Sequence, residues 1–81
     1  MTVRIQLWSY LKDLAGTDML DLDVPEDSTI QDVLEHLYAA HPKLETMRAS
    51  TMTAIDLEYR ERGHRLTAND TLSLLPPVQG G

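Results

Sequence analysis

Residues 2–7 alternate between polar and apolar side chains, which predicts a strand with one buried face. The same alternation returns in residues 20–24 and in residues 71–75, and it predicts two further strands. Residues 9–16 interrupt the pattern between the first two strands. We expect a short helical turn there that ends at Gly16, since glycine readily adopts the left-handed conformation of a helix end.

Residues 30–38 carry the clearest helical pattern. Their apolar positions are spaced as one stripe along a helix, made of Ile30, Val33, Leu34, Leu37 and Tyr38. Ser28 and Gln31 fit a capping box at the start of this helix, in which each side chain bonds the backbone amide of the other. His41 precedes Pro42, and a residue before proline disfavours helical geometry, so we expect the helix to end there.

Residues 53–59 predict a third strand, with Ile55 and Leu57 directed inward. A charged loop follows, and residues 66–70 predict a short strand or turn before the last strand. One amphipathic helix among four or five strands indicates an α+β domain of two layers. We expect the helix to pack across a mixed four- to five-stranded sheet in which the first and last strands are neighbours.

Composition narrows the classes of function. The chain has 81 residues, which fits one domain, and it has no cysteine, which excludes disulfides and thiolate metal ligands. Its formal net charge of −6 argues against nucleic acid or an anionic membrane as a partner, because both attract basic proteins. The sequence shows neither a signal peptide nor a membrane span, and we therefore expect a cytoplasmic protein.

Candidate catalytic residues form no recognisable constellation. The spacing of the histidines, His36, His41 and His64, does not fit a metal site. Two nearby carboxylates, Asp21 and Asp23, fit the solvent face of a strand, and no glycine-rich phosphate loop is present. We expect no metal, no bound cofactor and no enzymatic activity of the chain alone.

Two apolar residues, Trp8 and Leu75, point outward if the strand alternation is followed to its end. Both lie on the same open face of the sheet if the first and last strands are neighbours, and Tyr59 lies close to them. Clustered exposed apolar side chains are typical of protein interfaces. We therefore predict a partner-binding surface there.

The final six residues predict a tail, 76–81, that leaves a folded body formed by residues 1–75. The tail residues are Pro76, Pro77, Val78, Gln79, Gly80 and Gly81. The two prolines favour an extended exit, and six residues span about 20 Å at roughly 3.3 Å each. Because the two glycines lack side chains, the tail end could enter a narrow channel and expose its carboxylate to attack. These residues permit a carrier whose functional group is its own C-terminus.

Two stretches of the chain resemble the MoaD/ThiS family of ubiquitin-like sulfur carriers. In Leu7–Gly16 (LWSYLKDLAG), aromatic residues end a strand and a Leu-x-Gly pattern follows; the other stretch is Leu72–Gly81 (LSLLPPVQGG). The final Gly-Gly is shared by all ubiquitin-like proteins. The longer Pro-Pro-Val-x-Gly-Gly pattern resembles the molybdopterin branch in particular.

The resemblance implies a β-grasp fold and a sulfur cycle. An E1-like enzyme would use ATP to adenylate Gly81, and a sulfur donor protein would convert the product into a thiocarboxylate. The carrier would dock through Trp8, Tyr59, Leu75 and the tail on the large subunit of molybdopterin synthase, in a heterotetramer of two small and two large subunits. Sulfur would then pass to a pyranopterin precursor of the molybdenum cofactor, with catalytic groups supplied by the large subunit.

Other functions remain compatible with the same residues. Identical tail chemistry would serve a sulfur carrier for the thiazole of thiamine or for tRNA thiolation, although the Pro-Pro-Val spacing favours molybdopterin. A ubiquitin-like modifier would join Gly81 to lysines of other proteins. A binding module would use the apolar surface alone, with an incidental Gly-Gly.

Overall fold

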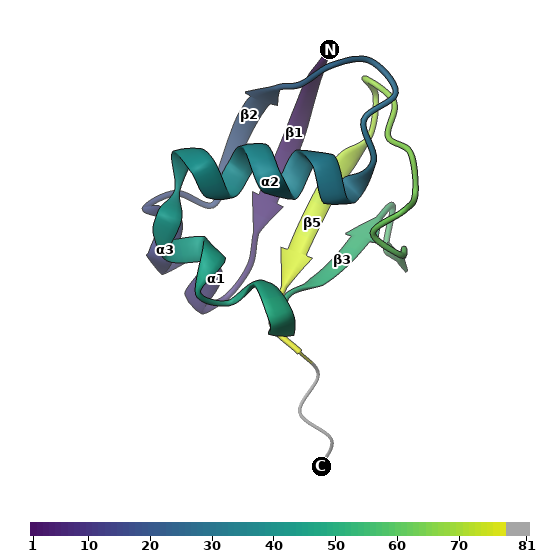
Figure 1. Cartoon of the computed structure of the whole chain (residues 1–81). Helices are drawn as coiled ribbons and strands as arrows, with labels where there is room; N and C mark the ends of the chain where they lie inside the picture. Colours follow the sequence, from purple (N-terminus) through teal and green to yellow (C-terminus); the bar gives the residue numbers. More distant parts are fainter. Residues whose placement is uncertain (78–81) are drawn as a thin grey trace.

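The computed structural model describes residues 1–77, which form a sheet with a helix packed across it (Figure 1). The elements in chain order are β1 (Thr2–Leu7), α1 (Tyr10–Ala15), β2 (Met19–Asp23), α2 (Ile30–Ala40), α3 (Pro42–Glu45), a 3-10 turn (Arg48–Ser50), β3 (Met52–Ile55), β4 (Glu58–Tyr59) and β5 (Thr71–Leu75).

Two strands from opposite ends of the chain pair at the centre of the sheet. β1 and β5 run parallel, with Ile5 opposite Leu72 and Leu7 opposite Leu74. The other neighbours are antiparallel, and the strand order is β2-β1-β5-β3-β4. This mixed sheet, crossed by α2, confirms the predicted α+β class, the β-grasp arrangement and the adjacency of the first and last strands.

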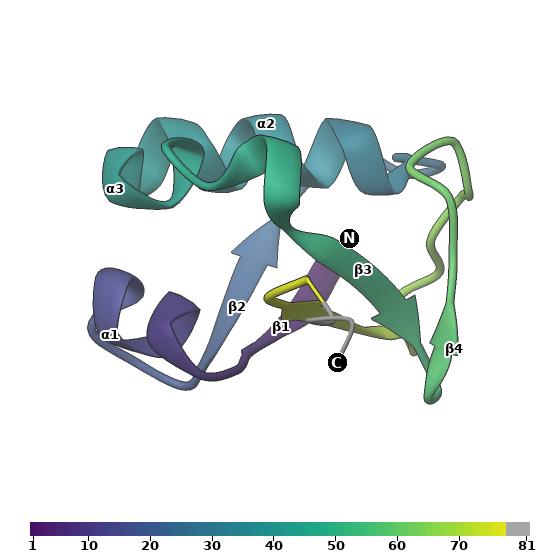
Figure 2. The ribbon, with the colours of Figure 1, turned by 90° about the horizontal axis from the view of Figure 1, so that it is seen from below.

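The core lies between the sheet and α2, and α3 lies on the same side of the sheet (Figure 2). The predicted apolar stripe of α2 is buried throughout. Alternate residues of the two central strands face it, because successive side chains of a strand point to opposite sides. These strand residues are at most 2% exposed: Val3, Ile5, Leu7, Leu72 and Leu74. The remaining strand residues face the side of the sheet that α2 does not cover.

The start of α2 lies one residue later than the capping prediction placed it. Thr29, and not Ser28, is the N-cap: its hydroxyl accepts from the Asp32 amide at 3.1 Å, and the Asp32 carboxylate accepts from the Thr29 amide at 3.0 Å. Ser28 instead donates to the carbonyl of Pro25 at 2.7 Å. The prediction from Ser28 and Gln31 was wrong because two overlapping four-residue windows both fit the capping pattern.

The predicted ends of the first two helices are confirmed. α2 ends at His41, whose amide donates to the Leu37 carbonyl at 2.8 Å, and Pro42 begins α3. α1 ends at Gly16, which has a left-handed φ of 78°. Among residues 1–77, no helix combines the length and the apolar character that crossing a lipid bilayer requires.

The predicted third strand, residues 53–59, is in fact two strands joined by a tight turn. β3 and β4 pair antiparallel around Asp56 and Leu57, whose φ angles are 52° and 67°. Two successive left-handed residues are the geometry of a type I′ turn, which matches the twist of a two-residue hairpin. Ile55 is buried as predicted, but the inward placement of Leu57 was wrong, since its side chain is fully exposed.

Thr29→Ala removes the hydroxyl that caps α2, and we expect the free energy of unfolding to fall by about 1 kcal/mol. Urea unfolding followed by circular dichroism measures the change. Thr67→Ala is the matched control, because Thr67 is exposed and lies outside the helices; its effect should stay within about 0.5 kcal/mol. Equal losses in the two variants would contradict the capping role.

Asp32→Asn tests the charged half of the same cap. Hydrogen bonding to Thr29, chiefly from its backbone amide, holds the pKa of the Asp32 carboxyl below its usual value of 3.8. A carboxyl with a lowered folded-state pKa stabilises the fold above its unfolded pKa and loses this effect as pH falls through the folded value. The unfolding midpoints of the original chain and the variant should therefore converge below about pH 4. Thermal unfolding at a series of pH values measures this, and a gap that persists to the lowest pH would contradict it.

Candidate docking surface and carboxyl-terminal tail

The face of the sheet opposite α2 is built by strand residues that alternate with the core. Ser73 of β5 lies between Gln6 of β1 and Ala54 of β3, and Tyr59 of β4 lies opposite Ala54. Thr71 and its neighbours make one end of this face polar. The end where β5 leaves the sheet is apolar.

An apolar hollow of about 150 Å³ lies at that second end. The residues that line it are Trp8, Ala54, Leu57, Tyr59, Ser73 and Leu75. Trp8 and Tyr59 are 45% and 56% exposed, whereas the small Ala54 is covered by its larger neighbours. The Trp8 amide donates to the carbonyl of Leu74 at 3.1 Å, so the pairing of β1 with β5 continues one residue beyond β1. The indole therefore starts from a fixed backbone position beside the end of β5.

The structure brings together Trp8 and Leu75, which the strand alternation placed on this face, and Tyr59, which we expected close to them. Trp8, Tyr59 and Leu75 all line the hollow, although their role in binding stays a prediction. Sequence reasoning missed Leu57, because it assigned this residue to the interior of a continuous strand. A turn between residues 55 and 58 would have been the signal, but leucine is not among the residues that favour such turns.

The predicted tail begins directly at the hollow. Leu75 lines it, and Pro76 and Pro77 follow as half-buried residues. The remaining predicted site residues, Val78, Gln79, Gly80 and Gly81, lie outside the described residues.

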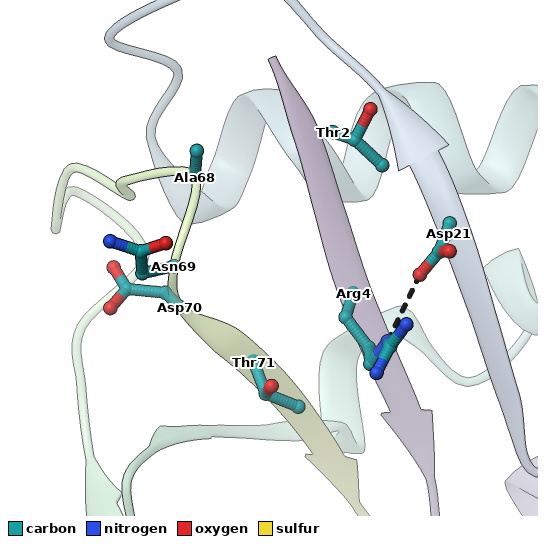
Figure 3. A pocket seen from close by; sticks show the side chains of 7 residues that line it. All are labelled: Thr2, Arg4, Asp21, Ala68, Asn69, Asp70 and Thr71. Atoms are coloured by element: carbon teal, nitrogen blue, oxygen red, sulfur yellow. Dashed lines mark hydrogen bonds and ion pairs between the residues drawn. The ribbon is translucent and has the colours of Figure 1, made fainter.

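A polar hollow of about 370 Å³ occupies the other end of the open face (Figure 3). Arg4 Nε donates to Asp21 Oδ1 at 3.2 Å across the pair of β1 and β2, and Asn69 and Asp70 lie on the facing side. Both Arg4 and Asp21 are more than half exposed, so water screens their attraction. Asp21 thus lies on the solvent face, as predicted, and this end of the sheet is a hydrated surface.

None of the three histidines lines the apolar hollow. His36 is exposed on α2, with Nδ1 2.9 Å from the Asp32 carbonyl oxygen; His41 ends that helix, and His64 precedes Leu66 in a loop. Within residues 1–77, no three histidine, aspartate or glutamate side chains are arranged to hold a metal ion.

Tyr38 is buried on the helix side of the molecule. Among the described residues its hydroxyl has no hydrogen-bond partner, and desolvation raises its pKa. The guanidinium carbon of Arg48 lies 5.4 Å from the centre of its ring. This contact joins α2 to the 3-10 turn and is remote from the open face.

Comparison with known proteins identifies the family. The model of the ThiS family matches residues 5–81. The chain belongs to the ThiS family. This match confirms the resemblance that the two sequence stretches indicated.

Relatives of this ThiS-family chain carry two kinds of name. The molybdopterin synthase sulfur carrier subunit of Arabidopsis thaliana is 30% identical over 79 residues, covering 98% of this chain and 82% of that protein. Small archaeal modifier protein 1 of Haloferax volcanii is 33% identical over 84 residues, covering 94% and 97%. The crystal structure of SAMP1 from Haloferax volcanii has a TM-score of 0.88 at 30% identity and full coverage of both chains.

A third similarity concerns the fold alone. A complex of subunits 1 and 2 of the molybdopterin-converting factor from Helicobacter pylori contains a chain with a TM-score of 0.70 and 18% identity, and the match covers 100% of both chains. These structures confirm the ubiquitin-like β-grasp fold of the ThiS-family chain.

Trp8→Ala should leave this ThiS-family chain folded and lower its free energy of unfolding by only about 1–2 kcal/mol, since nearly half of the indole is already exposed. Leu7→Ala is the comparison, because Leu7 is the preceding residue and is 2% exposed; its truncation should remove about 3 kcal/mol or more. Urea unfolding measures both. A larger loss for Trp8→Ala would contradict the surface assignment.

Proposed function

We propose that this chain is the sulfur carrier of a molybdopterin synthase. The observation that carries the proposal is the apolar hollow at the root of the tail: Leu75 lines the hollow, and Pro76 starts the segment that ends in Gly80 and Gly81. Membership of the ThiS family supports it, and so does the Arabidopsis relative that is a molybdopterin synthase sulfur carrier subunit.

Gly81 is the reacting residue in this proposal. Its carboxylate is a poor electrophile, so an E1-like enzyme first transfers AMP from ATP to it. Hydrosulfide delivered by a donor protein then attacks the acyl carbon, the bond from that carbon to the AMP oxygen breaks, and the terminal group becomes a thiocarboxylate while AMP leaves. Glycine suits this chemistry, because a β-carbon would crowd both the acyl carbon and a narrow entry channel.

The large subunit of molybdopterin synthase is the partner that we propose for the apolar hollow. Trp8 and Tyr59 are residue types that often dominate binding energy at interfaces. The Helicobacter pylori neighbour, which has the same fold, is in a complex of subunits 1 and 2 of a molybdopterin-converting factor. Groups that bind and protonate the pyranopterin would belong to the large subunit, in a cytoplasmic assembly of two small and two large subunits.

A second function, protein modification, is favoured by the Haloferax relative. That protein is a small archaeal modifier protein, and it is 33% identical to this chain. Gly81 would then form an amide with a lysine of a target protein. Adducts in cell lysate that survive denaturation and disappear when Gly81 is deleted would support modification. Binding to a thiazole synthase in place of the large subunit would instead indicate a carrier for thiamine.

Incubation with an activating enzyme, ATP and a sulfur source should raise the intact mass of the chain by the difference between one sulfur and one oxygen atom. Mass spectrometry measures the gain, and fragmentation should locate it at Gly81. Omitting ATP should abolish the gain, because the carboxylate is then not activated.

Gly81→Ala is the matched variant for this measurement. It should unfold at the same urea concentration as the original chain yet lose most of its sulfur transfer, since the added methyl crowds the acyl carbon. A mass gain elsewhere in the chain, or cofactor synthesis that continues after deletion of Gly81, would refute the proposed function.

A further inference from the structure

Leu57 is unfavourable in two respects: its backbone is left-handed, and its apolar side chain is exposed to water. Its φ of 67° lies in the left-handed region, where the Cβ of an L-residue crowds the following carbonyl. Its side chain is 101% exposed at the tip of the hairpin formed by β3 and β4, so none of its apolar surface is removed from water. Glycine or asparagine would satisfy the same turn without either penalty. Among residues 1–77, the backbone and the exposure of this position give leucine no advantage over glycine or asparagine.

Strained backbone gathers around the same surface. Four non-glycine residues in the part of the chain that the structure describes have a positive φ, and three of them, Ser9, Asp56 and Leu57, adjoin residues of the apolar hollow or belong to it. Ser9, which follows Trp8, combines a φ of 56° with a ψ of −138°. Outliers of this kind persist where the surrounding structure holds them, and they cluster at functional sites.

The same hollow connects Leu57 to the start of the tail. Leu57 and Leu75 both line it, and Pro76 follows Leu75 directly. A protein that binds the tail at Pro76 therefore lies next to Leu75 and the hollow. The hairpin tip is within reach of the same protein, because it borders the hollow on the side of β4.

The charges beside Leu57 indicate the chemistry of the surface that would cover it. Asp56 and Glu58 flank the leucine, and the whole chain has a net charge of −6. Glu58 is paired with Arg60 at 2.6 Å, but both side chains are exposed, so the pair is well hydrated. A complementary partner would present an apolar socket bordered by lysine or arginine, since complementary charges favour encounter and orientation.

We propose that Leu57 is a specificity-determining anchor that inserts into an apolar, basic-rimmed socket of the large synthase subunit. This inference rests on the proposed function and adds a contact point at the hairpin tip. The partner gains the burial of a leucine that the isolated chain leaves in water, and a carrier with asparagine or glycine in this turn lacks that contact. Leu57 thereby helps the large subunit to distinguish this carrier from related ones.

Binding of the full, uncharged chain to the large subunit from the same organism, measured by titration calorimetry, tests the anchor. Leu57→Asn should weaken binding about 10- to 100-fold, because the complex then loses the free energy gained by burying a leucine side chain. Leu57→Met keeps an apolar side chain of similar volume and should bind within about threefold of the original. Trp8→Ala, which truncates another side chain that lines the hollow, serves as a positive control and should also weaken binding.

Stability measurements separate binding from folding. Asparagine adopts the left-handed region more readily than leucine, so Leu57→Asn should unfold at the same temperature as the original chain or a higher one. Asp27→Asn is the matched control, because Asp27 is an exposed left-handed residue in the loop before α2, away from the open face. Its binding to the large subunit should be unchanged.

The binding results distinguish a failure of the Leu57 anchor from a failure of the proposed function. If the original chain binds the large subunit and Leu57→Asn binds equally well, the anchor is refuted and the proposed function stands. If the original chain does not bind, the proposed function fails and the anchor fails with it. If Leu57→Asn changes only the self-association seen by analytical ultracentrifugation, Leu57 contacts a second copy of this chain and the proposed anchor is wrong.

Discussion

The parallel pairing of β1 with β5 determines what this chain presents to other molecules. Parallel strands end at the same edge of a sheet, so Trp8 and Leu75 emerge side by side, and the hydrogen bond from the Trp8 amide to the Leu74 carbonyl extends the pairing to that edge. Arg4 pairs with Thr71, which means that this contact closes a loop containing most of the chain. The apolar hollow therefore forms only when β1 and β5, from opposite ends of the chain, have paired.

Because successive side chains of a strand point to opposite faces, one face of the sheet packs against α2 and the other is exposed to solvent. In β5, Leu74 is buried against the helix side, while the adjacent Leu75 lines the hollow on the open side. α2 covers one face only, so the other face must be compatible with water by itself. At its polar end, the exposed side chains of Arg4 and Asp21 form an ion pair and are hydrated. The apolar end is small, and the net charge of −6 opposes the approach of a second copy to it.

Strong periodicity made the strands, the stripe of α2 and the outward placement of Trp8 and Leu75 predictable from the sequence. The strand alternation failed where a two-residue turn interrupts it. Asp56 is compatible with left-handed geometry, but Leu57, at the position where glycine is usual, gives no signal of the turn. The cap of α2 was misplaced by one residue, because local hydrogen-bonding patterns at residues 28 and 29 compete on nearly equal terms. The hollow itself could be predicted only in part, since its lining depends on the order of four strands.

The proline pair lies between the apolar hollow and the proposed reacting residue, Gly81. Leu75 is the last residue that pairs with β3, opposite Met52, and Pro76 and Pro77 have no amide hydrogen with which to extend the sheet. If Gly81 is the reacting residue, the group that changes lies six residues after Leu75 in the sequence and is not part of the lining of the hollow. The binding energy of the hollow then acts equally on charged and spent carriers. In the proposed carrier, any preference of a partner for the charged form would therefore arise at the tail, while Trp8, Tyr59 and Leu57 would determine which partner is bound.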